Sequence, residues 1–226
     1  VKKGAGELSL DLGEGSYTIV KNNGNENNNT LISLPVTGDS PSDTSALSAL
    51  TVLEGALRIQ GEGADKTTVH ANDPVLIGGR YAGAAPSVLA LNDVTMTTDN
   101  HHISFGRNVP AGGRASALYM TNSVFRTNKL EFGHDESANP LEYVLNMKDS
   151  TLVDNYKIQF CWGNAAARIT ADNSVIECTG DNGLIIGRVN SAVFTGEQAA
   201  FRATKADGTG NAGRLLVYNS NFSEGA

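Results

Sequence analysis

The feature that most constrains the fold is an internal repeat with a period of about 27 residues. Five asparagines mark it, and successive members lie 28, 28, 27 and 27 residues apart: Asn72, Asn100, Asn128, Asn155 and Asn182. Soon after each asparagine comes an apolar-x-apolar step, which ends in a small residue: Gly78, Gly106, Gly133, Cys161 and Gly187. A repeat of this length indicates a stack of similar structural units.

A second set of polar pairs recurs with the same period: Asn92-Asp93, Asn122-Ser123, Asp149-Ser150 and Asn173-Ser174. Apolar residues stand four and two positions before each pair, which indicates a strand with one buried face. The residues expected on that face are Val88 and Ala90, Leu118 and Met120, Leu145 and Met147, and Ile169 and Ala171. Another short strand follows each pair, so each unit holds three short strands and no helical pattern.

Three short strands per unit, repeated in register, predict an all-β fold. We expect a single-stranded, right-handed parallel β-helix with about 27 residues per coil and about seven coils. One domain then spans residues 1–226, with N-terminal coils and two polar loops in 1–49, regular coils in 50–188 and irregular coils in 189–226. In the last part Asn190 comes only 17 residues after Asn173, which predicts a register change after Arg188 and a loop over 196–213.

The asparagine and small-residue columns have a physical reason. Apart from glycine, asparagine is the residue that best tolerates left-handed backbone angles, so it suits sharp corners between strands. Asparagines stacked in successive coils also hydrogen-bond along a ladder, and we expect such a ladder at Asn72, Asn100, Asn128, Asn155 and Asn182. The small residues that follow the apolar steps form a second column, which we call the small column: Gly78, Gly106, Gly133, Cys161 and Gly187. It predicts a bend at which a larger side chain would clash.

Composition narrows the classes of partner. The chain of 226 residues has a formal net charge of −7 and a pI of about 5.0, which argues against nucleic acid or an acidic membrane as the main partner. No stretch is long and apolar enough for membrane insertion. The chain begins at Val1 without a signal peptide, so we expect a mature protein or an excised piece. Cys161 and Cys178 are expected to be buried thiols, and a disulfide between them is the alternative.

The N-terminal quarter resembles a known family. Residues 3–10 read Lys-Gly-Ala-Gly-Glu-Leu-Ser-Leu, and residues 50–59 read Leu-Thr-Val-Leu-Glu-Gly-Ala-Leu-Arg-Ile. Together they resemble the autotransporter-associated β-strand repeat, which implies a β-helical stalk of a bacterial surface protein. Here an Asn-rich loop and a Pro- and Ser-containing loop separate the two halves, where the family has a short connection. Residues 60–226 resemble the pectate-lyase-like β-helix in fold, which does not transfer function.

The candidate ligand-binding residues follow the small column. Arg107, His134, Trp162 and Arg188 are expected to form a stripe along one edge, one coil apart. An exposed tryptophan flanked by guanidinium groups suits a sugar ring and its carboxylate or sulfate. The plainer interpretation is that these residues start loops and that Trp162 covers the edge of the core.

Metal and catalytic signals are weak. Asp154 and Asp181, on neighbouring coils, are candidates to share a Ca²⁺ ion, whereas the plainer interpretation is that each caps its own turn. The pair His101-His102 points to opposite faces of a strand, and His70 and His134 have no metal-ligand partners at a suitable spacing. No catalytic motif and no cofactor are therefore predicted.

The expected function is a non-enzymatic bacterial protein, extracellular or on the cell surface. We expect a stalk or adhesin segment that presents one long face to a polysaccharide or a host-surface glycan. The alternatives are a polysaccharide lyase or glycoside hydrolase with the pectate-lyase-like fold, and a spacer without a ligand. The last residues show no obvious cap, so further chain or a partner is expected to stack on the ends of the solenoid.

Overall fold

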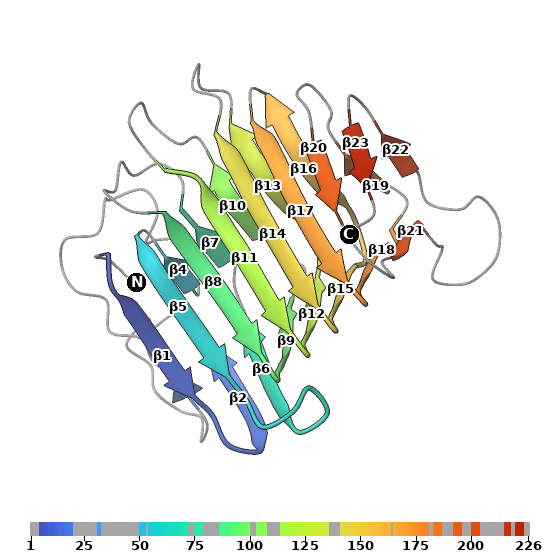
Figure 1. The fold of residues 1–226 in the computed structure, drawn as a ribbon. Coiled ribbons are helices and arrows are strands. Elements are labelled where there is room, and N and C mark those ends of the chain that lie inside the picture. The colour runs from blue at the N-terminus through green and yellow to red at the C-terminus, as the bar shows by residue number, and fades with distance from the viewer. Residues whose placement is uncertain are drawn as a thin grey trace.

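A computed structural model describes the chain over residues 5–19, 31–32, 50–52, 54–71, 75–78, 86–99, 103–107, 114–135, 141–163, 165–180, 183–186, 192–195, 200–203, 215–217 and 220–223. These ranges contain strands and turns but no helix. The strands form three parallel sheets that surround one core (Figure 1).

Sheet 1 has eight strands in the order β1 (Glu7–Asp11), β5 (Gly55–Gln60), β8 (Ser87–Asn92), β11 (Ser116–Thr121), β14 (Glu142–Lys148), β17 (Ala166–Asp172), β20 (Ala192–Thr195) and β23 (Ser220–Ser223). Sheet 2 has eight strands in the order β3 (Leu31–Ile32), β2 (Gly15–Ile19), β6 (Thr67–Ala71), β9 (Thr95–Thr98), β12 (Val124–Thr127), β15 (Thr151–Asp154), β18 (Val175–Cys178) and β21 (Ala200–Ala203).

Sheet 3 has seven strands in the order β4 (Leu50–Val52), β7 (Val75–Ile77), β10 (Ile103–Arg107), β13 (Leu130–Asp135), β16 (Ile158–Gly163), β19 (Leu184–Ile186) and β22 (Leu215–Val217). From β4 onward the chain visits sheets 3, 1 and 2 in strict rotation. This order confirms the predicted all-β parallel β-helix with three short strands per coil.

The repeat places equivalent apolar residues one above another. Leu118 of β11 lies beside Leu145 of β14 and Leu89 of β8, and all three side chains are buried. In the coil of β7, β8 and β9 the sequence prediction was wrong by one residue. Leu89 and Leu91 face the core there, and Val88 and Ala90 face outward. The corner pair of this coil is accordingly Asp93-Val94, not Asn92-Asp93.

The stack continues in rotation beyond Arg188, where irregular coils were expected. Phe194 of β20 lies beside Ile169 of β17 in sheet 1, and β21 then pairs with β18 in sheet 2. The predicted loop over 196–213 therefore contains a strand. The prediction failed because Asn190-Ser191 precedes a strand of sheet 1, whereas Asn173-Ser174 follows one.

Aromatic side chains stack along the core beneath sheet 3. The ring centroids of Phe105 and Phe132 are 4.5 Å apart with an interplanar angle of 7°, and those of Phe132 and Phe160 are 5.1 Å apart. The three phenylalanines are register partners on β10, β13 and β16, so the repeat itself produces the stack. Offset-stacked pairs of this kind add about 0.5–1.5 kcal/mol beyond the area that they bury.

The small column acts as predicted where the structure describes it. Gly106 and Gly133 have φ values of 71° and 66°, in the left-handed region that favours glycine. A Cβ on Gly106 would overlap the ring of Tyr143, and one on Gly133 would lie 2.6 Å from the Ala165 Cβ. The two glycines thus open the space that the buried Tyr143 fills.

Candidate functional site

The corner between sheets 1 and 2 carries a ladder of acidic and amide side chains. Its four members have positive φ values between 44° and 53°: Asp93, Asn122, Asp149 and Asn173. The Asn122 amide donates to the Asp93 carboxylate at 2.6 Å, and the Asn173 amide donates to Asp149 at 2.8 Å. Because amide and carboxylate alternate, each pair combines a donor with a charged acceptor.

Serine hydroxyls reinforce the same corner. The Ser150 Oγ accepts from the backbone N–H of Ser123 at 3.2 Å and donates to the Lys148 carbonyl at 2.7 Å. The Ser174 Oγ repeats this pattern one coil later, with the Ser150 N–H at 3.1 Å. Each buried hydroxyl therefore links two coils and satisfies a corner amide.

The second corner, between sheets 2 and 3, differs from the expectation in one respect. The residue with a left-handed φ there is Lys129 (73°), not Asn128. Asn155 is exposed, and its backbone N–H donates to the Thr127 carbonyl at 3.1 Å. Asn72, Asn100 and Asn182 lie outside the described residues, so the five-membered asparagine ladder stays a prediction.

The backbone brings three of the four candidate ligand-binding residues into register. Arg107 of β10 pairs with His134 of β13, and His134 pairs with Trp162 of β16. They occupy consecutive strands of sheet 3, next to the positions of Gly106, Gly133 and Cys161. Their side chains and the whole of Arg188 lie outside the described residues, so the stripe stays a prediction.

Asp154, a candidate calcium ligand, caps its own turn. Its side chain is 0% exposed; one carboxylate oxygen accepts from the backbone N–H groups of Tyr156 at 2.7 Å and Lys157 at 2.6 Å. The other oxygen accepts from the Thr127 hydroxyl at 2.6 Å. Burial raises the pKa of the Asp154 carboxyl above its ordinary value, although these hydrogen bonds act in the opposite direction.

This geometry supports the capping interpretation for Asp154. Asp181, its expected partner in a calcium site, lies outside the described residues. Among the described residues, no group of three or more His, Cys, Asp or Glu side chains is arranged to hold a metal ion.

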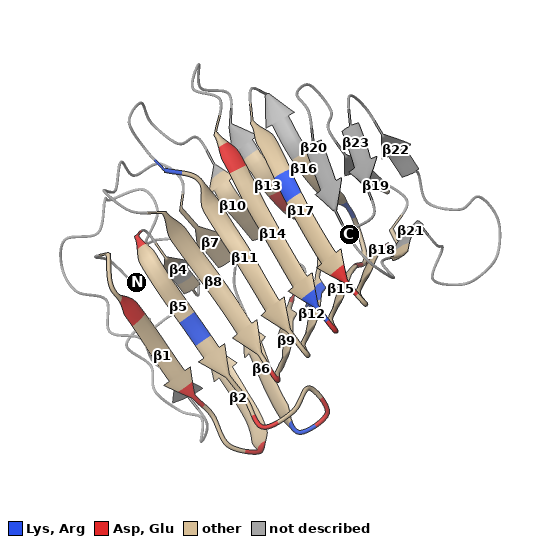
Figure 2. Cartoon of the chain, viewed as in Figure 1, with Lys and Arg blue, Asp and Glu red and all other residues tan. Residues whose placement is uncertain are grey.

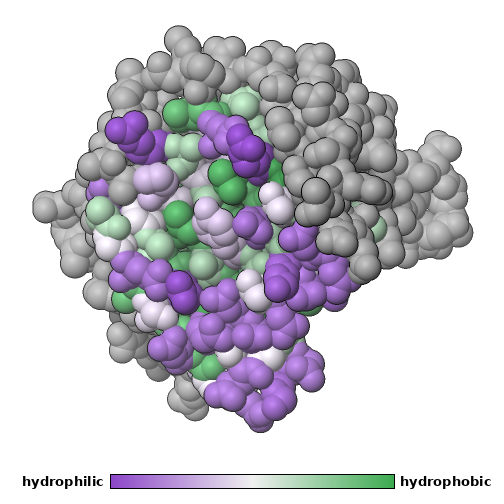
Figure 3. All heavy atoms as spheres, in the orientation of Figure 1, coloured by the Kyte–Doolittle hydropathy of each residue, from purple (hydrophilic) through white to green (hydrophobic). Residues whose placement is uncertain are grey.

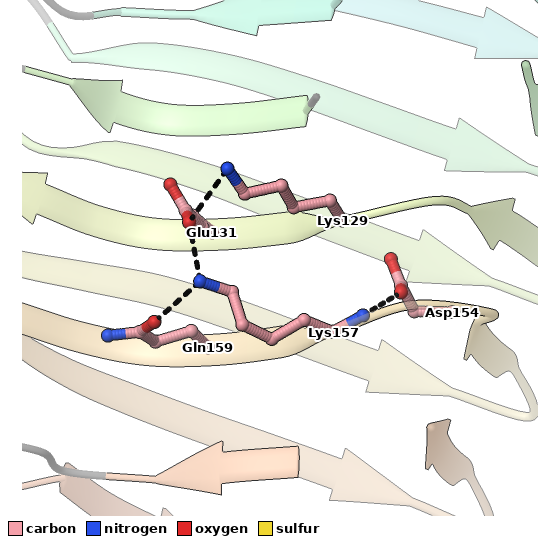
Figure 4. A network of polar contacts seen from close by, with 5 residues as sticks. All are labelled: Lys129, Glu131, Asp154, Lys157 and Gln159. Atoms are coloured by element: carbon pink, nitrogen blue, oxygen red, sulfur yellow. Dashed lines mark hydrogen bonds and ion pairs between the residues drawn. The ribbon is translucent and has the colours of Figure 1, made fainter. Parts of the chain in front are cut away.

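The sequence analysis missed a buried polar cluster on the outer side of sheet 3. The Lys157 Nζ lies 2.8 Å from the Glu131 carboxylate and donates to the Gln159 Oε1 at 2.9 Å (Figure 4). Lys129 approaches the same Glu131 oxygen at 3.8 Å. Glu131 is 3% exposed and Gln159 is 1% exposed, so the ion pair is largely withdrawn from water.

Among the described residues, two polar atoms next to this cluster are buried without a hydrogen-bond partner: the Ser104 Oγ and the Gln159 Nε2. Ser104, Glu131 and Gln159 are register neighbours on three consecutive strands. The signal for this row was present in the sequence, because each residue is the middle member of an apolar-x-apolar step. Only the pairing register, however, brings Lys157 to a glutamate 26 residues earlier.

A histidine without an assigned partner has two in the structure. The His70 Nδ1 lies 2.7 Å from the Thr97 hydroxyl, and the Nε2 lies 3.2 Å from the Asp99 carboxylate. Asp99 is exposed and His70 is partly exposed on the outer side of sheet 2. The contacts fix the imidazole on the sheet face, so we assign them a structural role.

Cys178 is a free, buried thiol, as the plainer interpretation expected. Burial raises the pKa of this thiol, which disfavours the reactive thiolate. The side chain of Cys161 lies outside the described residues.

Comparisons of the chain with models of protein families, with curated proteins and with solved structures gave no match. Within the described ranges, no helix is long and apolar enough to cross a membrane.

Proposed function

We propose that this chain is a rigid, non-enzymatic segment of a bacterial extracellular or cell-surface protein, and that one lateral face binds a glycan. Support for the bacterial surface comes from the resemblance of the N-terminal quarter to the autotransporter-associated repeat. Support for the rigid scaffold comes from the continuous stack of sheets, because a solenoid presents an extended surface whose shape is set by its coils.

The observation that carries the glycan proposal is the register of Arg107, His134 and Trp162. Consecutive parallel strands lie about 4.8 Å apart, so these residues follow one another along the solenoid at that spacing. An aromatic ring next to cationic or hydrogen-bonding groups suits the apolar face of a sugar and its acidic substituent. The proposed ligand of this edge is therefore an acidic polysaccharide.

The alternative enzymatic function has less support. Glycoside hydrolysis commonly uses two carboxylates on either side of the scissile bond. On the outer face of sheet 1, the carboxylates lie next to neutral or basic register partners. Glu7 pairs with Ala56, Asp11 with Gln60, and Asp172 with Lys148. We therefore favour binding without cleavage.

The test measures retention and cleavage together. The purified chain is passed over immobilised polygalacturonate and dextran sulfate, and the size of the recovered soluble polysaccharide is determined after incubation. We expect retention without shortening, and a loss of retention in Trp162→Ala. Tyr156→Ala is the matched control, because Tyr156 is an exposed aromatic residue (45%) at a corner. Shortened polysaccharide would replace this proposal with an enzymatic one.

A further inference from the structure

The outer face of sheet 1 has an uncharged centre. Its middle row runs, in register, through Arg58 of β5, Ala90 of β8, Tyr119 of β11, Asn146 of β14 and Thr170 of β17. We define the neutral face by its outward residues: Val88, Ala90 and Asn92 of β8, Ala117, Tyr119 and Thr121 of β11, and Val144 and Asn146 of β14. In Figure 2 the strands β8 and β11 are tan, because neither contains a charged residue.

Apolar side chains line one side of the middle row and polar ones line the other. The first side is formed in register by Ala56, Val88, Ala117 and Val144. The second side is formed by Gln60, Asn92 and Thr121. Figure 3 shows hydrophobic and weakly polar residues interspersed at the centre of the face, with strongly hydrophilic residues along its lower part. A flat surface of this kind matches a ligand with an apolar face and polar edges.

At each end of the neutral face, a positive and a negative side chain form an ion pair. Arg58 contacts Glu7 through two nitrogens, at 3.1 Å and 3.2 Å. Arg168 makes a bidentate pair with Glu142, at 2.9 Å and 3.0 Å. Because these charges are mutually compensated, they offer little net attraction to a charged ligand.

Tyr119 is the group on this face that is best suited to hold a ligand. Its side chain is 40% exposed, and its register neighbour on β8 is the small residue Ala90. Within the described part of the chain, the side chains of Asn146 and Thr121 make no hydrogen bond with another residue, so their polar groups are available. An aromatic platform with adjacent amide and hydroxyl groups is the usual composition of a site for an uncharged polar ligand.

We propose that the neutral face binds an uncharged polysaccharide, laid along the solenoid axis across β8, β11 and β14. The strand spacing of about 4.8 Å is close to the length of one sugar unit in an extended chain, so successive sugars meet equivalent positions. The apolar face of one sugar packs on Tyr119 and Ala90. The hydroxyl groups at the sugar edges bond to Asn146, Thr121 and Asn92.

This inference deepens the proposed function and rests on it, because it adds a second site with the opposite charge preference. It concerns residues whose side chains are described, whereas the acidic-glycan site on sheet 3 rests on backbone register.

The test is affinity electrophoresis of the whole chain in native gels that contain mixed-linkage β-glucan, galactomannan or dextran. Parallel gels contain polygalacturonate. The variants are Tyr119→Ala, which removes the platform, and Ala90→Glu, which places a charge on the neutral face without truncating any contact. Tyr156→Ala and Trp162→Ala are the controls. Circular dichroism and the urea midpoint of each variant establish that the fold is intact.

We expect at least one uncharged polysaccharide to retard the wild-type chain, and its apparent affinity to fall at least tenfold in Tyr119→Ala and in Ala90→Glu. Both controls should bind it as the wild type does. Unchanged binding in both folded variants would overturn the neutral face as the site, as would the absence of retardation by all three uncharged polymers. If the neutral face fails this test but polygalacturonate still retards the chain in a Trp162-dependent manner, the proposed function is retained. If no polymer retards it, both proposals are wrong.

Discussion

Asn122 and Asp93, which lie in neighbouring coils 29 residues apart in sequence, share a hydrogen bond of 2.6 Å while both residues hold a left-handed φ. The pair shows that the same corner residues meet two structural requirements of this solenoid. The corner needs a residue that tolerates a positive φ, and the stack needs a side chain that bonds to the next coil. Asparagine and aspartate satisfy both requirements.

Substitution of Asn122 should separate these two roles. Asn122→Gly keeps the φ of 46° accessible but loses the bond to Asp93, so we expect a loss of about 0.5–1.5 kcal/mol in the free energy of unfolding. Asn122→Ala loses the bond and also strains the backbone, which adds about 1 kcal/mol. Urea unfolding measures both. Equal stability of the two variants would mean that the backbone angle carries no cost here.

Gly106 should tolerate no side chain. Gly106→Ala places a methyl group against the ring of Tyr143 at a φ of 71°, so we expect a destabilisation of about 3 kcal/mol or more. Gly63→Ala is not a suitable control, because its φ is also positive. Gly6→Ala is suitable, since a Cβ there meets no atom within 4 Å, and it should leave the urea midpoint nearly unchanged. A similar midpoint in both variants would contradict the predicted clash.

Stability should depend on pH through Asp154. Burial raises the pKa of this carboxyl in the folded state, so its contribution to stability is complete below the ordinary aspartate pKa and is lost as the pH rises through the folded pKa. Asp154→Asn keeps the cap without the charge. We therefore expect the variant to match the wild type below the ordinary aspartate pKa and to become relatively more stable as the pH rises through the raised pKa of the folded state.

The measurement for Asp154 is the difference in unfolding free energy between variant and wild type at several pH values. A difference that stays constant with pH would contradict the raised pKa. Asp154→Ala serves as the reference for loss of the cap itself, since it removes the acceptor of the Tyr156 and Lys157 N–H groups and should destabilise at every pH.

The sequence was sufficient for the parts of the fold that depend on periodicity. The 27-residue spacing and the alternation around Leu118 and Met120 predicted parallel strands in register, because such a pattern buries one face in every coil. The coil of β7, β8 and β9 was misaligned because Asn92 and Asp93 suit a corner equally well. Only the positive φ of Asp93 distinguishes them. Local residue preference therefore predicts that a corner exists, but not which of two adjacent polar residues forms it.

The candidate site was less predictable, since a binding surface on a solenoid combines residues about 27 positions apart. Arg107, His134 and Trp162 were aligned correctly because each follows the small column directly. The neutral face could not be recognised from the sequence, because half of its residues are alanine and valine, which carry no chemical signature. Its interest arises only when the register places Tyr119 among them and places the charges at either end.

The buried pair of Glu131 and Lys157 provides the last prediction. Lys157→Met removes the 2.8 Å contact to the Glu131 carboxylate, which is 3% exposed, so we expect a destabilisation of about 3–5 kcal/mol. The double variant Glu131→Gln and Lys157→Met removes both charges and should recover most of that loss, because an uncharged pair has no ionic desolvation cost. A double-mutant cycle by urea unfolding gives the coupling energy. If the double variant were as unstable as the sum of the single ones, the two side chains would act independently, and the 2.8 Å contact would have no energetic role.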